Sequence, residues 1–167
     1  MKNTFNLGKD TLYTIEAPGG VIGFDINDHT NIERLKAMYE VFEKEEKRYR
    51  AEEVIISKQE DGKKDKFGIT SKERKEINNY DKYILGVKNA IDTFFGEGAS
   101  DKIFYDELLE RVVVTLPRAE TLLFDILPEH FEKANLKSEE YMNERLKKRD
   151  RFVSKEKDVV DLDEEVA

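Results

Sequence analysis

The sequence predicts a mainly α-helical fold, a helical bundle, with a small antiparallel β ribbon at the N-terminus. Apolar residues recur every three or four positions through most of the chain, and short alternating apolar sets occupy the first 27 residues. Charged residues make up 40% of the chain and hydrophobic residues 38%, so apolar side chains must be concentrated on stripes. We expect a ribbon over 1–27 packed on a helical domain over 28–153, followed by an acidic tail over 154–167 that is disordered when free.

The first 27 residues have the pattern of two or three short strands. Apolar residues at Phe5 and Leu7, and then within 12–15 and 21–26, are separated by turn residues such as Pro18-Gly19-Gly20. Such a ribbon is only marginally stable by itself, so we expect a helix to pack on one of its faces.

Two capping-box signatures, Thr30 with Glu33 and Thr70 with Glu73, predict the starts of two long helices. Between these helices, residues 57–68 read as a polar, mobile loop. The first helix has its apolar positions at Ile32, Leu35, Met38, Tyr39, Phe42 and Tyr49. The second has a continuous apolar stripe at Ile77, Tyr80, Ile84, Val87, Ile91 and Phe94. Another helix or another subunit must cover that stripe.

The second long helix should stop at Gly96-Glu97-Gly98. We expect a helix C-cap at the first glycine, a left-handed backbone at one of the two glycines, and an N-cap at Ser100. A third helix should then run through Phe104 to Leu116 and end or kink at Pro117, with a further apolar helix over 119–127. Gly96, Gly98 and Ser100 are therefore predicted structural residues.

The chain offers little catalytic chemistry. It contains no cysteine, and its two histidines, His29 and His130, are far apart in the sequence. No serine lies in a nucleophile-elbow context. Asp25, Asp28 and Glu33 have the residue types of a divalent-cation site, but helix capping and compensation of the helix dipole explain the same residues without such chemistry, and we favour that explanation. We predict a protein that is not an enzyme, with no catalytic residue, no metal site and no cofactor.

The net charge of the chain also argues against two classes of partner. The formal net charge of −8 argues against binding nucleic acid or an anionic membrane surface. The lysines of Lys63-Lys64-Asp65-Lys66 alternate with acidic residues, which favours a solvated loop over a nucleic-acid site. The start of the chain has no apolar core of a signal peptide, and no run reaches transmembrane length, so we expect a cytoplasmic protein.

One stretch carries a resemblance to a known group. Ile91-Asp-Thr-Phe-Phe-Gly-Glu-Gly-Ala-Ser-Asp-Lys-Ile-Phe104, together with Gly23-Phe-Asp-Ile-Asn-Asp28, resembles small uncharacterised tail-region proteins of Gram-positive phages and prophages. The resemblance covers about residues 20 to 116. It implies a tail assembly chaperone in the host cytoplasm, with a tape-measure or tube protein as partner. It carries no catalytic residue.

Such a chaperone needs apolar helical surfaces on a charged, soluble body. The candidate protein-binding residues are Ile84, Val87, Ile91, Phe94, Phe95, Phe104, Leu122, Leu123 and Phe124. Two other functions stay open: an acidic phage inhibitor that mimics nucleic acid and blocks a host protein, and a structural tail or connector component of the virion. A homo-oligomer also stays open.

Overall fold

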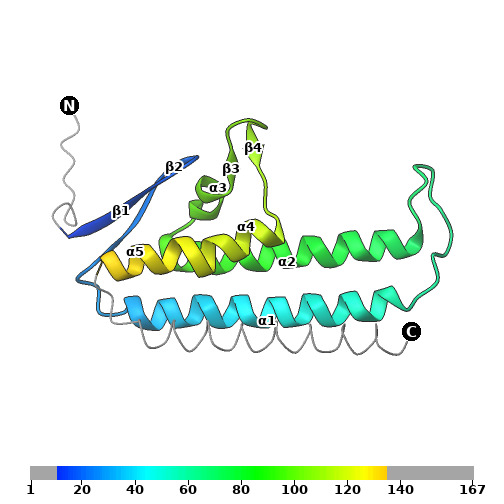
Figure 1. Cartoon of the computed structure of the whole chain (residues 1–167), viewed down its shortest axis with the longest axis horizontal. Helices are drawn as coiled ribbons and strands as arrows, with labels where there is room; N and C mark the ends of the chain where they lie inside the picture. The colour runs from blue at the N-terminus through cyan, green and yellow to red at the C-terminus, as the bar shows by residue number, and fades with distance from the viewer. Residues whose placement is uncertain (1–10, 135–167) are drawn as a thin grey trace, which may run out of the picture. The chain divides into compact units, whose positions relative to one another are not determined.

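A computed structural model describes residues 11–134 of the chain. The expected strand at Phe5 and Leu7 and the acidic tail over 154–167 lie outside the described residues. The chain divides into two compact units, one ending at Ala119 and the other beginning at Glu120. The predicted fold class is confirmed: the described residues are mainly helical, with a small antiparallel β ribbon preceding the helices (Figure 1).

The ribbon consists of β1 (Leu12–Ala17) and β2 (Gly20–Asp25), joined by a tight turn at Pro18 and Gly19. The two strands are antiparallel, with Ile15 opposite Ile22. The side chains that alternate toward one face, Ile15, Ile22 and Phe24, are buried. The alternating pattern of the sequence therefore gives a ribbon with one covered face, as expected.

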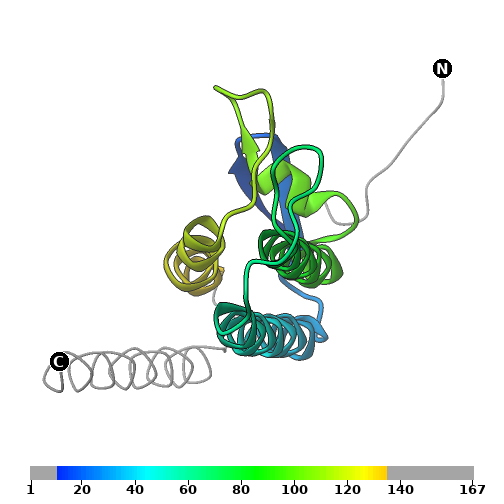
Figure 2. The same cartoon turned by 90° about the vertical axis from the view of Figure 1, so that its right-hand side faces the viewer.

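The core of the first unit is a helical hairpin of α1 (Asn31–Ser57) and α2 (Ser71–Phe95). The two helices lie side by side and antiparallel, as Figures 1 and 2 both show. The apolar side chains that α1 buries are Leu35, Met38, Tyr39, Phe42 and Ile56. Those of α2 are Tyr83, Val87, Ala90, Ile91 and Phe94. Each helix thus buries one stripe, which is the arrangement expected of amphipathic helices.

The predicted stripe of α2 is correct in its C-terminal half and rotated in its N-terminal half. Asn79 and Tyr83 are buried there, whereas Ile77 is 41% exposed. The Asn79 amide accepts a hydrogen bond from Arg48 Nη1 (3.0 Å) and donates one to the Tyr49 carbonyl (3.1 Å). Apolar periodicity does not detect such a polar contact between helices. The predicted stripe in this half of α2 is therefore shifted by one residue from the positions that are buried.

One of the two predicted capping boxes is confirmed. The Thr70 hydroxyl accepts the Glu73 N–H (3.1 Å) at the start of α2. The box at Thr30 and Glu33 is wrong, because the Thr30 side chain makes no capping bond. Instead the Asp28 carboxylate accepts both the N–H (2.9 Å) and the hydroxyl (2.6 Å) of Thr30. A charged acceptor two residues upstream organises this turn in place of the hydroxyl.

The break after α2 follows from its glycines. Gly96 has φ +106° and Gly98 has φ +84°, which confirms the expected left-handed backbone. The predicted N-cap at Ser100 is wrong, since Gly98 is the N-cap of the short helix α3 (Ala99–Ile103) and Ser100 is buried inside it. The Ser100 N–H donates to the Asp92 carboxylate at 2.7 Å, so the acceptor comes from the preceding helix.

The predicted third helix to Leu116 is also wrong. The helix α3 ends at Ile103, and a hairpin of β3 (Tyr105–Asp106) and β4 (Arg111–Val112) follows it. The Asp106 carboxylate accepts a backbone N–H of the hairpin loop, so local turn chemistry outweighs the helical spacing of the apolar residues there.

Helical residues continue from α4 (Leu116–Thr121) through a π-helical turn, η1 (Leu122–Ile126), to α5 (Leu127–Lys133). The expectation that Pro117 ends or kinks a helix is wrong. Pro117 lies in the first turn of α4, where its missing N–H leaves no hydrogen bond unmade. No helix within residues 11–134 has the length and apolar character needed to cross a membrane.

Candidate functional site

The residues predicted to bind a partner contribute mostly to the folded core. Val87, Ile91, Phe94, Phe104, Leu122 and Leu123 are buried, whereas Ile84, Phe95 and Phe124 are half-buried. The amphipathic pattern that singled them out therefore also describes their packing within this chain. A docking surface on the structure as described has to be built from other, exposed side chains.

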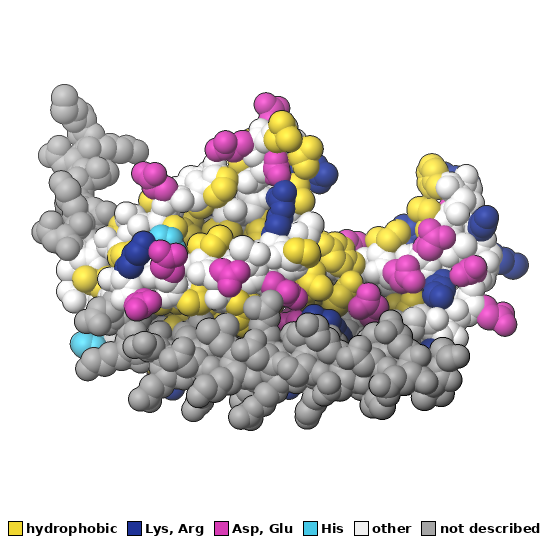
Figure 3. Space-filling view, viewed as in Figure 1, with side chains coloured by type: hydrophobic (Ala, Val, Ile, Leu, Met, Phe, Trp, Pro, Cys, Tyr) yellow, Lys and Arg dark blue, Asp and Glu magenta, His cyan; other side chains and the backbone are white. Residues whose placement is uncertain are grey.

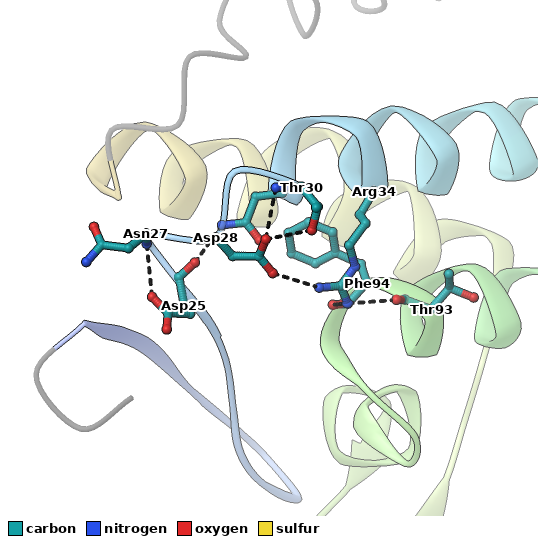
Figure 4. A network of polar contacts seen from close by, with 8 residues as sticks. Asp25, Asn27, Asp28, Thr30, Arg34, Thr93 and Phe94 are labelled. Carbon is teal, nitrogen blue, oxygen red and sulfur yellow. Dashed lines mark hydrogen bonds and ion pairs between the residues drawn. The ribbon is translucent and has the colours of Figure 1, made fainter. Parts of the chain in front are cut away.

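A polar network joins the start of α1 to the end of α2 (Figure 4). Arg34 Nη2 donates to the carbonyls of Thr93 (2.9 Å) and Phe94, and the Arg34 guanidinium lies 5.6 Å from the centroid of the Phe94 ring. Arg34 Nη1 also lies 3.7 Å from Asp28 Oδ2. A cation on the last carbonyls of a helix complements the helix dipole, so we interpret this network as a structural cap of α2.

Two of the three carboxylates considered for a cation site, Asp25 and Asp28, accept hydrogen bonds in turns. Asp25 Oδ1 accepts the Asn27 N–H at 2.9 Å, and Asp28 organises the turn before α1. The hydrogen bonds from Thr30 lower the pKa of Asp28 below its usual range, with a smaller contribution from Arg34. Within residues 11–134 no three His, Cys, Asp or Glu side chains are grouped so that they could hold a metal ion.

The β3–β4 hairpin presents two leucines to solvent. Leu108 is 91% exposed and Leu109 is 50% exposed. The backbone behind them is held by Asp106, whose carboxylate accepts the Leu109 N–H (2.9 Å) and pairs with Arg118 Nη2 (2.7 Å). The hydrogen bond from the Arg118 side chain is the main cause that lowers the pKa of Asp106. We call Leu108 and Leu109 the Leu-Leu tip.

The loop between α1 and α2 presents an aromatic side chain in the same way. Phe67 is 74% exposed. Asp65 Oδ1 accepts the N–H groups of Phe67 (2.8 Å) and Ile69 (3.1 Å), and Asp65 Oδ2 pairs with Arg74 Nη2 (2.9 Å). These bonds lower the pKa of Asp65, the backbone bond from Ile69 most of all. The expected polar loop is therefore present, but its backbone is organised around one carboxylate.

The backbones of the two loops are stabilised in the same way. Each has an aspartate that accepts loop N–H groups and pairs with an arginine of the helix that follows, Arg74 of α2 or Arg118 of α4. Because the loop backbone is held, an apolar side chain at its end keeps its position while it stays exposed. Both loops project from the same side of α2, and the molecular surface is hollowed between them (Figure 3).

Exposed apolar residues of α2 lie between the two loops along the chain. Ile77 is 41% exposed and Leu85 is 60% exposed, on a helix that turns its buried stripe toward α1. We define the tip surface as Phe67, Ile77, Leu85, Leu108 and Leu109. Sequence periodicity placed Ile77 on the covered stripe of α2 and did not identify this surface, because three of its residues lie in loops. The available signal was an aspartate two residues before the exposed side chain of each loop, Asp65 before Phe67 and Asp106 before Leu108.

Comparisons of the chain with protein-family models, with curated proteins and with solved structures found no match.

Proposed function

We propose that this protein is a tail assembly chaperone-like protein of a phage or prophage, which binds helical segments of the tape-measure or tube protein in the host cytoplasm. The observation that carries the proposal is the tip surface: two loops with organised backbones present large apolar side chains on one side of α2. The resemblance of the segments around Gly23 and from Ile91 to Phe104 to phage tail-region proteins supplies the biological context.

The geometry of the tip surface suits a helical client. Ile77 and Leu85 are eight residues apart on a helix, which separates them by about 12 Å along the axis and about 80° around it. The apolar side chains of a client helix recur at similar intervals, so a helix lying between the two tips could contact both α2 and the tips. Contacts divided among small, separate patches are individually weak, which favours release when the tail polymerises.

Charge distinguishes this proposal from a nucleic-acid mimic. A mimic would bind a basic host protein mainly through carboxylates, and its affinity would fall steeply with added salt. An interface built on leucine and phenylalanine side chains depends on apolar burial and should change little between low and high salt. The salt dependence of the affinity of any complex therefore distinguishes an apolar interface from a nucleic-acid mimic.

The test is co-expression of this chain with the tape-measure and tube proteins of the same phage. We expect one of them to become more soluble and to co-purify with the chain. The double substitution Leu108→Glu with Leu109→Glu, and separately Phe67→Glu, should abolish co-purification while the circular dichroism spectrum stays unchanged. Val41→Glu is the matched control, because Val41 is an exposed apolar residue on α1, away from the tip surface.

Three results would decide against the proposal or a part of it. If neither tail protein gains solubility nor co-purifies, the chaperone function is wrong. If the chain is retained in purified phage particles, a structural virion component is the better interpretation. If the tip variants bind as well as the parent protein while Val41→Glu does not, the client binds through α1 and the tip surface has no part in it.

A further inference from the structure

The outer edge of β1 is an unpaired strand edge within the described part of the chain. Residues pair across the ribbon as Leu12 with Asp25, Thr14 with Gly23 and Glu16 with Val21. The Ile26 N–H bonds to the Thr11 carbonyl at 2.9 Å, which identifies Thr11 and every second residue after it as the positions that bond to β2. The N–H and C=O groups of Leu12, Thr14 and Glu16 therefore point away from β2.

These outward groups make no hydrogen bond to any part of residues 11–134, and their side chains are all exposed. The other edge of the ribbon is different. There the Lys102 ammonium donates to the Val21 carbonyl (3.2 Å) and the Asn31 amide donates to the Asp25 carbonyl (2.6 Å). One edge of the ribbon is thus occupied by neighbouring elements, and no residue between 11 and 134 occupies the edge formed by β1.

The β1 edge also lacks the usual protection against strand pairing. Natural edge strands are commonly protected by lysine, proline or a bulge. β1 reads Leu-Tyr-Thr-Ile-Glu-Ala, with regular pairing throughout and neither lysine nor proline within it. Its only charge is the carboxylate of Glu16.

We propose that β1 pairs with β1 of a second copy of this chain, antiparallel and about a two-fold axis at Thr14, to give a four-stranded sheet. In this register Thr14 faces its own copy, and Leu12 faces Glu16 of the other. The three outward residues of each copy bond to one another, which forms about six backbone hydrogen bonds. A threonine pair is favourable across antiparallel strands, and the two Glu16 carboxylates are kept apart. A two-fold axis at Glu16 would instead place the carboxylates opposite each other.

The absence of cysteine makes the register directly testable by cross-linking. Thr14→Cys places two thiols opposite each other at the two-fold axis, at a separation that a disulfide can bridge. In the same register the two thiols of a Glu16→Cys dimer would be four residues apart along the strand, about 14 Å, which is too far for a disulfide. Under mild oxidation we expect Thr14→Cys to give a covalent dimer and Glu16→Cys to stay monomeric.

The parent protein should also dimerise reversibly. Because the interface is small, sedimentation is best done at concentrations on the order of 100 μM. Thr14→Lys places two ammonium groups opposite each other and should weaken association roughly tenfold or more, while its thermal unfolding matches that of the parent. A monomeric parent, equal cross-linking at positions 14 and 16, or a dimer that tolerates Thr14→Lys would each overturn the proposal. None of these results depends on tail-protein binding, because the edge residues are not part of the tip surface.

Discussion

The two ends of the α1–α2 hairpin are packed very differently. At the end where α1 begins and α2 stops, Leu35 and Ile91 are fully buried, and the Phe94 ring lies 5.6 Å from that of Phe24 in the β ribbon. At the other end, where α1 stops, Ile56 is buried but the neighbouring Val54 and Ile55 are each 54% exposed. We call these the closed end and the open end.

The difference lies in how many elements each end contacts. At the closed end the ribbon and α3 supply further apolar side chains, so the helices are covered on more than one side. The Arg34 network also joins the start of α1 to the end of α2 there. At the open end the two helices are joined by the loop that bears Phe67. Helices with similar apolar patterns therefore form a core at one end and leave apolar side chains exposed at the other.

The largest expected effect is at the closed end. Phe94→Ala removes a buried ring that contacts the rings of Phe24 and Phe95 and lies beneath the Arg34 guanidinium. We expect the free energy of unfolding, measured by urea titration, to fall by about 3–5 kcal/mol. Phe67→Ala at the open end should change it by less than about 0.5 kcal/mol. Similar losses for both variants would contradict the division into two ends.

Gly98 and Gly68 have nearly the same backbone conformation but lie at different ends of the hairpin. Gly98 at the closed end has φ +84° and Gly68 in the open-end loop has φ +81°, and an added Cβ would meet no atom within 4 Å at either site. Gly98→Val should destabilise the protein by about 1–3 kcal/mol, because valine is strained in this conformation. Gly68→Val should cost a similar amount, because its φ lies in the same region and the loop backbone around Asp65 is held by hydrogen bonds. Thermal unfolding of both variants tests this, and unchanged stability of Gly98→Val would contradict the capping argument.

The starts of α1 and α2 are stabilised by different side chains. Thr70 caps α2 with its side chain, whereas Thr30 does not cap α1. Thr70→Ala should lower the free energy of unfolding by about 1 kcal/mol. Thr30→Ala should cost less, because the Thr30 hydroxyl caps no N–H of α1 and only donates to the exposed Asp28 carboxylate. Urea titration of the two variants would show the reverse order if the capping assignments were wrong.

The smallest expected effect is on pH dependence. Asp28 at the closed end and Asp65 at the open end both have a pKa below the usual value for aspartate. A carboxyl whose pKa is lowered by folding stabilises the protein above its unfolded pKa, about 3.9, and this contribution is lost as pH falls through the folded pKa. Asp28→Asn and Asp65→Asn should each flatten the decline of stability below about pH 4 relative to the parent. Unfolding titrations at several acidic pH values that overlay the parent profile would contradict these roles.

Local signals in the sequence were sufficient for several elements. The start of α2 at Thr70, the glycine break after it and the Pro18–Gly19 turn each depend on residues within a few positions of one another. The fold class followed from apolar spacing, which reflects burial along each element. The sequence also predicts the start of α1 at Thr30, but the side chain that organises this turn is that of Asp28.

Only the tertiary structure decided which apolar side chains are covered. The rotated stripe of α2 depends on contacts between Asn79 and residues of α1 about 30 positions away. The tip surface and the open edge of β1 depend on what the remaining elements leave exposed. Burial is a property of the whole packed unit, so a pattern along one segment predicts that a face is apolar but not whether the same chain covers it.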